Sequence, residues 1–227
     1  MKRLFFDIET EANPENVALM SEPVIEAPAN YKDPEKIAAY IAEKTAAAKA
    51  AAIEKAALDP DYGRVLSLGA TYAPDYEISI IAVGAPCEDA LGGVWTETLI
   101  IERFWKLLAA CDGYCVGYNI LNFDLPYLMR RSMALGIKVP FIPNLAKFRT
   151  EPVTDLMAIL YNWGGQTYKG LKTVAKLYKI PVQCPDVDGS MVKDLTPEKL
   201  AEYQRSDVQL VIDLYRRMNG VYFNHAN

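Results

Sequence analysis

Residues 5–10 read FFDIET, an apolar start followed by two carboxylates in alternation. Positions 2–8 are predicted to form the first strand of a sheet, because the apolar run at 4–6 has high strand propensity. Side chains two apart in a strand point to the same face, so Asp7 and Glu9 should project side by side, roughly 7 Å apart. Two anions held this close favour a divalent cation between them, and oxygen ligands suit Mg²⁺ or Mn²⁺. A solvated strand edge is the alternative interpretation of an isolated Asp-x-Glu pair.

The composition predicts one globular domain whose chemistry does not use histidine. The chain has 227 residues, 51% of them hydrophobic, which is ample for one core. Its apolar runs are too short for a membrane span of roughly 20 residues, and the basic start meets Asp7 too early for a signal peptide. The single histidine, His225, lies in the C-terminal tail, a poor place for a catalytic base. Ser-His-Asp and Cys-His mechanisms are therefore not expected.

The cysteines and the charge distribution point to a reducing compartment and to a nucleic-acid partner. The four cysteines lack zinc-type spacing, so we expect free thiols and a cytoplasmic location. The net charge is −5, but residues 125–180 hold nine Lys/Arg against two acids, a net charge of +7, together with seven aromatics. Basic residues interleaved with aromatics are typical of a surface that follows a nucleic-acid backbone and stacks bases. A solvated helix face is the plainer alternative.

An alanine-rich helix is predicted over residues 33–58, with Asp33 as N-cap and Pro34 at its first position. This stretch holds 11 alanines and no glycine, and Asp59-Pro60 ends it. Its apolar stripe is thin: Ile37, Tyr40, Ile41, Ile53 and Leu58. We therefore interpret residues 13–60 as an insertion within a single domain that covers 1–227.

The remaining chain predicts an α/β domain around a mixed sheet, because a strand hairpin precedes an alternation of strands and helices. The helix at 98–110 should turn Leu99, Phe104, Leu107 and Leu108 inward. The expected strands are 64–72, 78–83 and 114–118, and the other expected helices are 125–135 (closed by Gly136), 170–178 and 197 to about 218.

Two further acidic positions occur later in the chain. Residues 117–128 read GYNILNFDLPYL, which places Asp124 where a strand turns into a helix. Asp124 could equally be the N-cap of that helix. Residues 203–207 read YQRSD, and the spacing of four puts Tyr203 and Asp207 on one face of the last helix.

Taken together, FDIET, GYNILNFDLPYL and Y-x3-D resemble the DEDD superfamily of 3′–5′ exonucleases. The position five residues before the last Asp is Glu202 rather than His, which is similar to the tyrosine (DEDDy) subgroup. The N-x3-F-D core is most similar to the proofreading exonuclease of family B DNA polymerases. The resemblance covers most of the chain outside 13–60 and implies an RNase H-like fold with an Ala-rich helical insertion. Since 227 residues leave no room for polymerase palm and fingers, we expect a stand-alone nuclease.

The resemblance also implies a role for each catalytic candidate. Asp7 would bridge two Mg²⁺ or Mn²⁺ ions about 3.5–4 Å apart, which stabilise the attacking and the leaving oxygen. Glu9 and Asp207 would complete the site of the attacking water, and Asp124 would serve the other metal. Tyr203 would orient the water, since a phenol is a poor base at neutral pH.

The expected substrate is the 3′ end of single-stranded DNA, released as 5′-mononucleotides. Asn119 is expected to contact the terminal nucleotide, and Phe123 to wedge against the terminal bases unless it is a plain core residue. Thr10, Lys172 and Lys176 are further candidates for substrate contacts. The alternatives are an exoribonuclease of the same superfamily and a catalytically inactive nucleic-acid-binding module.

Overall fold

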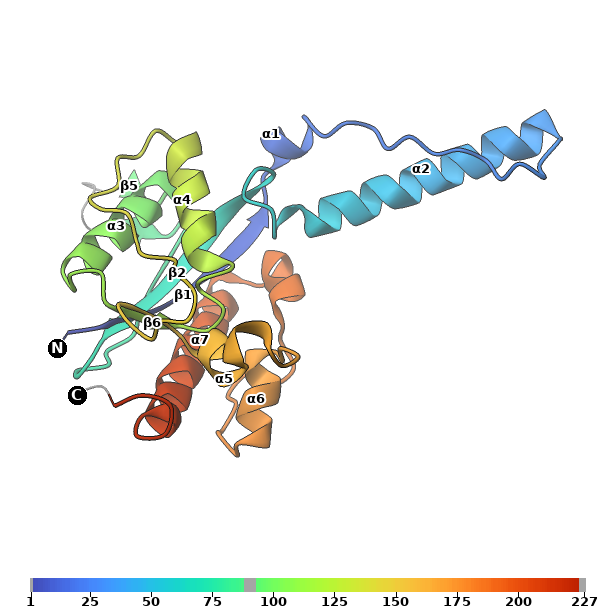
Figure 1. Cartoon of the computed structure of the whole chain (residues 1–227). Helices are drawn as coiled ribbons and strands as arrows, with labels where there is room; N and C mark the ends of the chain where they lie inside the picture. Colours follow the sequence, from blue (N-terminus) through green and yellow to red (C-terminus); the bar gives the residue numbers. More distant parts are fainter. Residues whose placement is uncertain (1, 88–92, 225–227) are drawn as a thin grey trace. The chain divides into compact units, whose positions relative to one another are not determined.

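The computed structural model describes residues 2–87 and 93–224, so the expectation for His225 falls outside the described residues. The chain divides into two compact units, one of Met1–Glu9 with Val65–Asn227 and the other of Thr10–Arg64. The larger unit is built on a five-stranded sheet of order β3-β2-β1-β6-β7 (Figure 1). These strands are β1 Leu4–Ala12, β2 Gly63–Tyr72, β3 Ser79–Ala82, β6 Cys115–Gly117 and β7 Val153–Asp155.

The sheet is mixed, as the order of strands and helices in the sequence predicts. β2 and β3 form the antiparallel hairpin, whereas β1 pairs parallel with β6, and β6 pairs parallel with β7. β1 runs four residues beyond the expected end at residue 8, so both carboxylates of the FFDIET stretch lie inside the strand. Two short strands, β4 Pro86–Cys87 and β5 Gly93–Val94, form a separate antiparallel pair.

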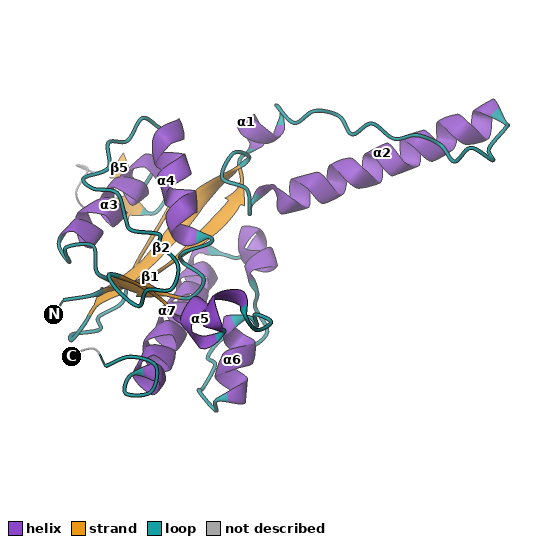
Figure 2. Cartoon of the chain, in the orientation of Figure 1, coloured by secondary structure: helices purple, strands orange, loops and turns teal. Residues whose placement is uncertain are grey.

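Helices cover both faces of the sheet (Figures 1 and 2). One side carries α3 Glu97–Ala109 and α4 Asp124–Ala134; the other carries α5 Leu156–Leu160, α6 Leu171–Leu177 and α7 Pro197–Met218. Two short 3₁₀ helices, Asn162–Gly164 and Gly189–Asp194, follow α5 and precede α7. Along β1, Leu4 and Phe6 belong to one hydrophobic cluster and Phe5 to the other, as strand alternation requires. Among the described residues, no helix has the length and apolar character needed to cross a bilayer.

The apolar stripe of α3 is broader than the sequence analysis predicts. Phe104 and Leu108 are buried as expected, but Leu99 and Leu107 are only half-buried. The other fully buried positions are Ile100, Ile101 and Trp105. The buried positions follow the i, i+1, i+4, i+5, i+8 spacing of one wide helix face. The centre of this buried face lies about one residue away from the centre of the predicted face.

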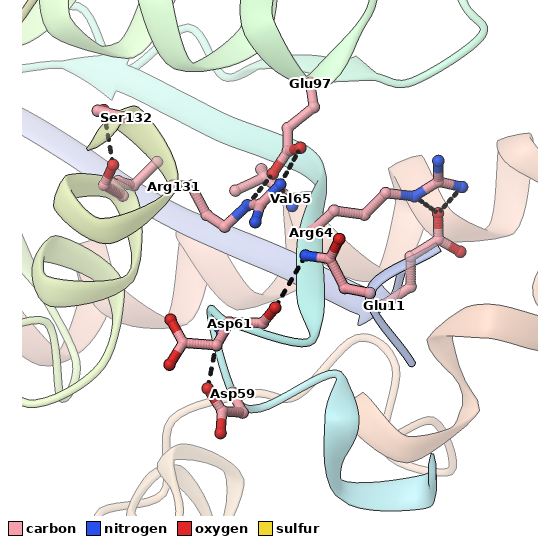
Figure 3. Close-up of polar contacts among 10 residues, drawn as sticks. Glu11, Asp59, Asp61, Arg64, Val65, Glu97, Arg131 and Ser132 are labelled. Carbon is pink, nitrogen blue, oxygen red and sulfur yellow. Dashed lines mark hydrogen bonds and ion pairs between the residues drawn. The ribbon is translucent and has the colours of Figure 1, made fainter. Parts of the chain in front are cut away.

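A buried ion pair connects α3, α4 and β2 (Figure 3). The Arg131 guanidinium donates two hydrogen bonds to the Glu97 carboxylate, at 2.8 and 2.9 Å. The same carboxylate accepts the backbone N–H of Val65 at 2.9 Å. The two side chains are only 4% and 11% exposed. The Glu97 carboxylate therefore connects α3 to both α4 and β2 on this side of the sheet.

The smaller unit contains α1 Pro14–Val17 and the long helix α2 Pro34–Ala56. Asp33 caps α2 as predicted, its carboxylate accepting the N–H of Glu35 at 3.0 Å. The apolar stripe is shallow: Ile37, Tyr40 and Ile41 are half-buried, while Ile53 and Leu58 are exposed. Near the ends of this unit, Arg64 pairs with Glu11 at 2.7 Å (Figure 3). The unit overlaps the insertion predicted at 13–60.

Candidate active site

Asp7 and Glu9 lie on the face of β1 that is covered by α7. Their neighbour on that face, Phe5, packs edge-on against Tyr215 of α7, with ring centroids 5.0 Å apart. Asp7 is half-buried and Glu9 is only 8% exposed. The strand therefore directs two carboxylates into a sheet–helix layer, where their charges are poorly solvated.

The helix α7 approaches this face closely and is held to it by a hydrogen bond. The buried Gln204 side chain donates from Nε2 to the backbone oxygen of Asp7 at 3.0 Å. Gly69 of β2 makes the approach possible: a Cβ there would lie 2.8 Å from Val208 Cγ2 and 2.9 Å from Gln204 Cγ. Tyr203 and Asp207 are thus carried by a helix whose register against β1 is set directly at Asp7.

Asp124 reaches the same region from the start of α4. It is 3% exposed, and its Oδ1 accepts the backbone N–H of Ile8 in β1 at 3.3 Å. The N-cap position of α4 belongs to Phe123, which makes no side-chain capping bond. The alternative interpretation of Asp124 as an N-cap is therefore wrong, because its carboxylate is engaged by the strand.

The four carboxylates Asp7, Glu9, Asp124 and Asp207 form one electrostatic group, here named the acidic cluster. Burial raises the pKa of Asp7, and the charges of the other three raise it further. Burial also raises the pKa of Glu9, with Asp207 and Asp124 adding to the shift. The pKa of Asp124 is raised to about 7, chiefly by burial and against the hydrogen bond from Ile8. Each ionised carboxylate in the cluster thus opposes the ionisation of its neighbours.

Two groups partly offset this repulsion. Burial raises the pKa of Asp207, while the charge of Lys172 and the hydrogen bond from the Tyr203 hydroxyl oppose that rise. Lys172 has a similar lowering effect on the pKa of Glu9. One ammonium beside four carboxylates leaves a net negative site, which would repel a phosphate without further cations.

The donor types of the acidic cluster, rather than their arrangement in this structure, suit a hard divalent cation. Within residues 2–87 and 93–224, no three acidic, cysteine or histidine side chains are arranged to hold a metal ion. The chemistry of the donors nevertheless suits Mg²⁺ or Mn²⁺, since all four are carboxylates that mutually oppose ionisation. Asp207 Oδ1 is also buried without a hydrogen-bond partner among the described residues, as a ligand oxygen would be.

Of the two candidate lysines, the structure brings Lys172 to the cluster. Its ammonium donates to the backbone oxygens of Cys184, at 2.6 Å, and of Val187, and lies 4.7 Å from the centre of the Tyr203 ring. Lys176 is exposed on α6. Lys172 is thus held in place by main-chain acceptors beside the carboxylates, whereas Lys176 faces solvent.

The other predicted substrate contacts are Asn119, Phe123 and Thr10. Asn119 adopts a left-handed conformation with φ 67°, just after β6. Phe123 is half-buried, packs on the core and faces Tyr127 with ring centroids 5.4 Å apart, so the plain core role is present. Thr10 follows Glu9 in β1 and is buried. Contact of these three residues with substrate stays a prediction.

Asp155 and Gln204 are two positioning residues that the sequence analysis does not single out. Asp155 is fully buried, and its carboxylate accepts the backbone N–H groups of Asn119, Leu121 and Ala158 at 2.9–3.0 Å. It therefore caps α5 and fixes the loop that carries Asn119. An Asp directly before an apolar helix is a recognisable capping signal. A single glutamine inside a helix gives no comparable signal for Gln204.

The raised pKa values predict an unusual pH dependence of stability in the absence of metal. A carboxyl whose pKa is raised on folding binds more protons in the native state, so stability falls as pH rises from the unfolded pKa, about 4, through the folded pKa. For Asp124 this window ends at about 7. In EDTA, the thermal midpoint should decrease as the pH rises from about 4 to about 7. Asp124→Asn should make this decrease smaller. Calorimetry across this range tests the expectation, with the exposed Asp75→Asn as control; equal slopes in both variants would contradict it.

Comparison with known proteins agrees with this geometry. Residues 64–222 match a family described as a predicted 3′–5′ exonuclease related to the exonuclease domain of PolB. The chain belongs to this family. The matched range contains Asp124, Tyr203 and Asp207 and begins after the strand that bears Asp7 and Glu9.

The DNA polymerases to which this chain is similar are much longer than the chain itself. DNA polymerase 1 of Aeropyrum pernix is 29% identical over 126 residues, which cover 48% of this chain and 12% of that protein. A DNA polymerase of Pyrococcus glycovorans is 34% identical over 67 residues, 29% of this chain and 9% of that protein. The fold matches the family B DNA polymerase of Pyrobaculum calidifontis with a TM-score of 0.56 at 19% identity, over 96% of this chain and 24% of that one. The RNase H-like α/β fold and the PolB-like 3′–5′ exonuclease domain expected from the sequence are confirmed.

Proposed function

We propose that this chain hydrolyses phosphodiester bonds at the 3′ end of single-stranded DNA, with divalent metal ions, and releases 5′-mononucleotides. One observation carries the proposal: β1, α4 and α7 bring the acidic cluster and Tyr203 together as one electrostatically coupled, largely buried group. A phosphodiester hydrolase needs such a group because negative charge develops on the phosphate, the attacking water and the leaving oxygen.

The acidic cluster would hold Mg²⁺ or Mn²⁺, and two such ions would balance its formal charge. When bound, they would supply electrostatic stabilisation of the attacking and leaving oxygens. Asp7 would be a principal ligand, and the charges of Glu9, Asp124 and Asp207 all raise the pKa of its carboxyl.

Tyr203 acts as a positioning group rather than as a base. Burial and the charges of Glu9 and Asp207 raise the pKa of its hydroxyl above the ordinary value, so the phenol stays protonated at neutral pH. Its hydroxyl hydrogen-bonds to Asp207, which places it at the cluster. A protonated hydroxyl in this position can orient the attacking water but cannot remove its proton.

The terminal nucleotide would lie between the acidic cluster and the Asn119 loop. Asp155 holds that loop through its backbone N–H groups and not through the Asn119 side chain. The charge of Lys172 acts on both Glu9 and Asp207, and this ammonium would face the scissile phosphate. Single-stranded ends should be preferred, since each duplex step must first be opened at a cost of about 1.4 kcal/mol.

One gel tests the proposal directly. Single-stranded DNA and RNA of equal sequence, labelled at the 5′ end, are incubated with Mg²⁺, Mn²⁺ or EDTA. We expect a ladder that shortens from the 3′ end, for DNA and only with metal, and 5′-mononucleotides as products. Full activity in EDTA would contradict the metal mechanism, and faster loss of RNA would favour the exoribonuclease alternative.

Replacing Tyr203 by Phe should lower turnover by about 100-fold, because it removes one oriented hydrogen bond while the ring continues to fill its site. Thermal stability should change little. Single-turnover rates at saturating DNA measure the effect. Tyr72→Phe is a matched control, because its hydroxyl also bonds within the fold, to Leu107 O at 3.2 Å, but on the opposite side of the sheet. A turnover of Tyr203→Phe equal to that of the parent would contradict the proposal that Tyr203 positions the attacking water.

A further inference from the structure

A small pocket of about 50 Å³ opens beside the Asn119 loop. Its polar lining consists of Asn122, Lys147, Trp163 and Tyr168, and none of the described lining residues is acidic. Leu121 contributes to its apolar wall. The volume suits a water or the oxygens of a small anion, and is too small for a nucleobase.

The side chains around this pocket offer more hydrogen-bond donors than acceptors, because Asn122 and Tyr168 can accept but Lys147 and Trp163 can only donate. The Trp163 indole Nε1 is buried and has no hydrogen-bond partner among the described residues. Indole and ammonium groups can only donate, and so Trp163 and Lys147 both favour an acceptor. The Asn122 amide donates one N–H to the side-chain oxygen of Asn119 at 3.3 Å and keeps a second. An unpaired buried donor is costly, and an anion would satisfy several donors at once.

The backbone at Trp163 also departs from the usual conformation. Asn162 and Trp163 have φ values of 49° and 48°, the left-handed region that non-glycine residues rarely adopt. Such conformations are retained where the surrounding structure requires them, and they are enriched at ligand-binding sites.

An exposed aromatic ring lies next to the pocket. Phe148 is 72% exposed and faces Trp163 with ring centroids 5.5 Å apart. Its neighbours in sequence are Lys147 and Arg149, both exposed. An anion site beside an exposed aromatic and a second cation has the chemistry of a nucleotide contact, in which a phosphate is bound and a base is stacked.

We propose that the Trp163 pocket binds a backbone phosphate of the single-stranded substrate, on a nucleotide that precedes the 3′-terminal one, while Phe148 stacks on a base. The inference rests on the proposed function, because Asn119 is the expected contact of the terminal nucleotide and Asn122 links it to the pocket. It extends the substrate path beyond the acidic cluster and gives part of the basic, aromatic stretch at 125–180 a defined task.

Binding measurements test the pocket independently of hydrolysis. With Asp7→Asn as the parent, so that DNA persists, the affinity for a fluorescent 12-nucleotide DNA is measured by anisotropy at several salt concentrations. Trp163→Phe keeps an aromatic ring, although a smaller one, but removes the N–H and should weaken binding about tenfold. Lys147→Gln should weaken it similarly and reduce the salt slope by about 0.7, the value for one phosphate contact on a single strand. The half-buried Trp95→Phe and the exposed Lys106→Gln serve as matched controls and should bind like the parent.

Substrate length separates a phosphate subsite from a structural role. In the active protein, both pocket variants should lose about tenfold in kcat/KM on the 12-nucleotide DNA and nothing on a dinucleoside monophosphate, whose single phosphate is the scissile one. Equal losses on both substrates would show that the pocket merely supports the Asn119 loop, and would overturn the proposal.

The remaining outcomes are also distinct. Unchanged affinity in both pocket variants would overturn the subsite and leave the nuclease function intact. Absence of hydrolysis by the active protein would overturn the function, while the binding experiment would still decide on the pocket. If inorganic phosphate changed Trp163 fluorescence but 12-nucleotide affinity were insensitive to both variants, the pocket would be a free-anion site and not part of the DNA path.

Discussion

Asp7→Asn should reduce 3′-end hydrolysis by about 10³-fold or more, the largest loss expected from any single change in the acidic cluster. The substitution keeps the shape of the side chain but removes a negative charge that interacts with those of the other three carboxylates. Under the proposed function, loss of a carboxylate that would hold the divalent ions removes several kcal/mol of transition-state stabilisation. Single-turnover kinetics at saturating Mg²⁺ measure the loss.

A second measurement distinguishes this loss from misfolding. Because burial and like charges raise the pKa of Asp7, its neutral replacement should raise the thermal midpoint in EDTA at pH 8. The exposed Asp75→Asn should change neither activity nor stability. If Asp7→Asn retained a tenth of the parent rate, Asp7 would not be a principal ligand.

Glu97→Ala should destabilise the protein by about 3–5 kcal/mol, because it removes the carboxylate that accepts two hydrogen bonds from the buried Arg131 guanidinium. The same substitution removes the acceptor of the Val65 N–H, which adds a second unsatisfied group. Urea denaturation followed by circular dichroism measures the change. A decrease of less than about 0.5 kcal/mol in the free energy of unfolding would show that this ion pair contributes little to stability.

The double variant Glu97→Leu with Arg131→Met is the control for charge burial. Replacing both partners of a buried pair by apolar side chains of similar volume is often neutral or stabilising. We expect the double variant to recover most of the loss, with a remaining deficit from the Val65 N–H. The exposed pair Lys44–Glu43, whose groups lie 3.2 Å apart, should contribute little when changed in the same way.

The sequence predicts those features of the fold that depend on local periodicity. The alternation along β1 places Phe5, Asp7 and Glu9 on one face, and α7 begins and ends where proline and the apolar spacing indicate. The cap at Asp33 follows from a two-residue pattern. In each case the decisive interaction lies within one element, so no knowledge of distant neighbours is needed.

Features that depend on distant neighbours could not be predicted in this way. The contact of Asp124 with Ile8 spans 116 residues, and that of Asp155 with Asn119 spans 36. Lys172 differs from Lys176 only because the loop near Cys184 presents backbone oxygens to it. A sequence pattern names the candidates, but tertiary packing decides which carboxylate caps a helix and which lysine faces the cluster.

The hydrogen bond between Gln204 and Asp7 joins residues that are 197 positions apart. During translation, a growing chain therefore possesses its first two carboxylates long before the helix that supplies the last one has emerged from the ribosome. No nascent fragment that stops short of α7 contains the whole acidic cluster. The proposed nuclease activity would therefore require that α7 has been synthesised, and a chain truncated before Asp207 should not hydrolyse nucleic acids.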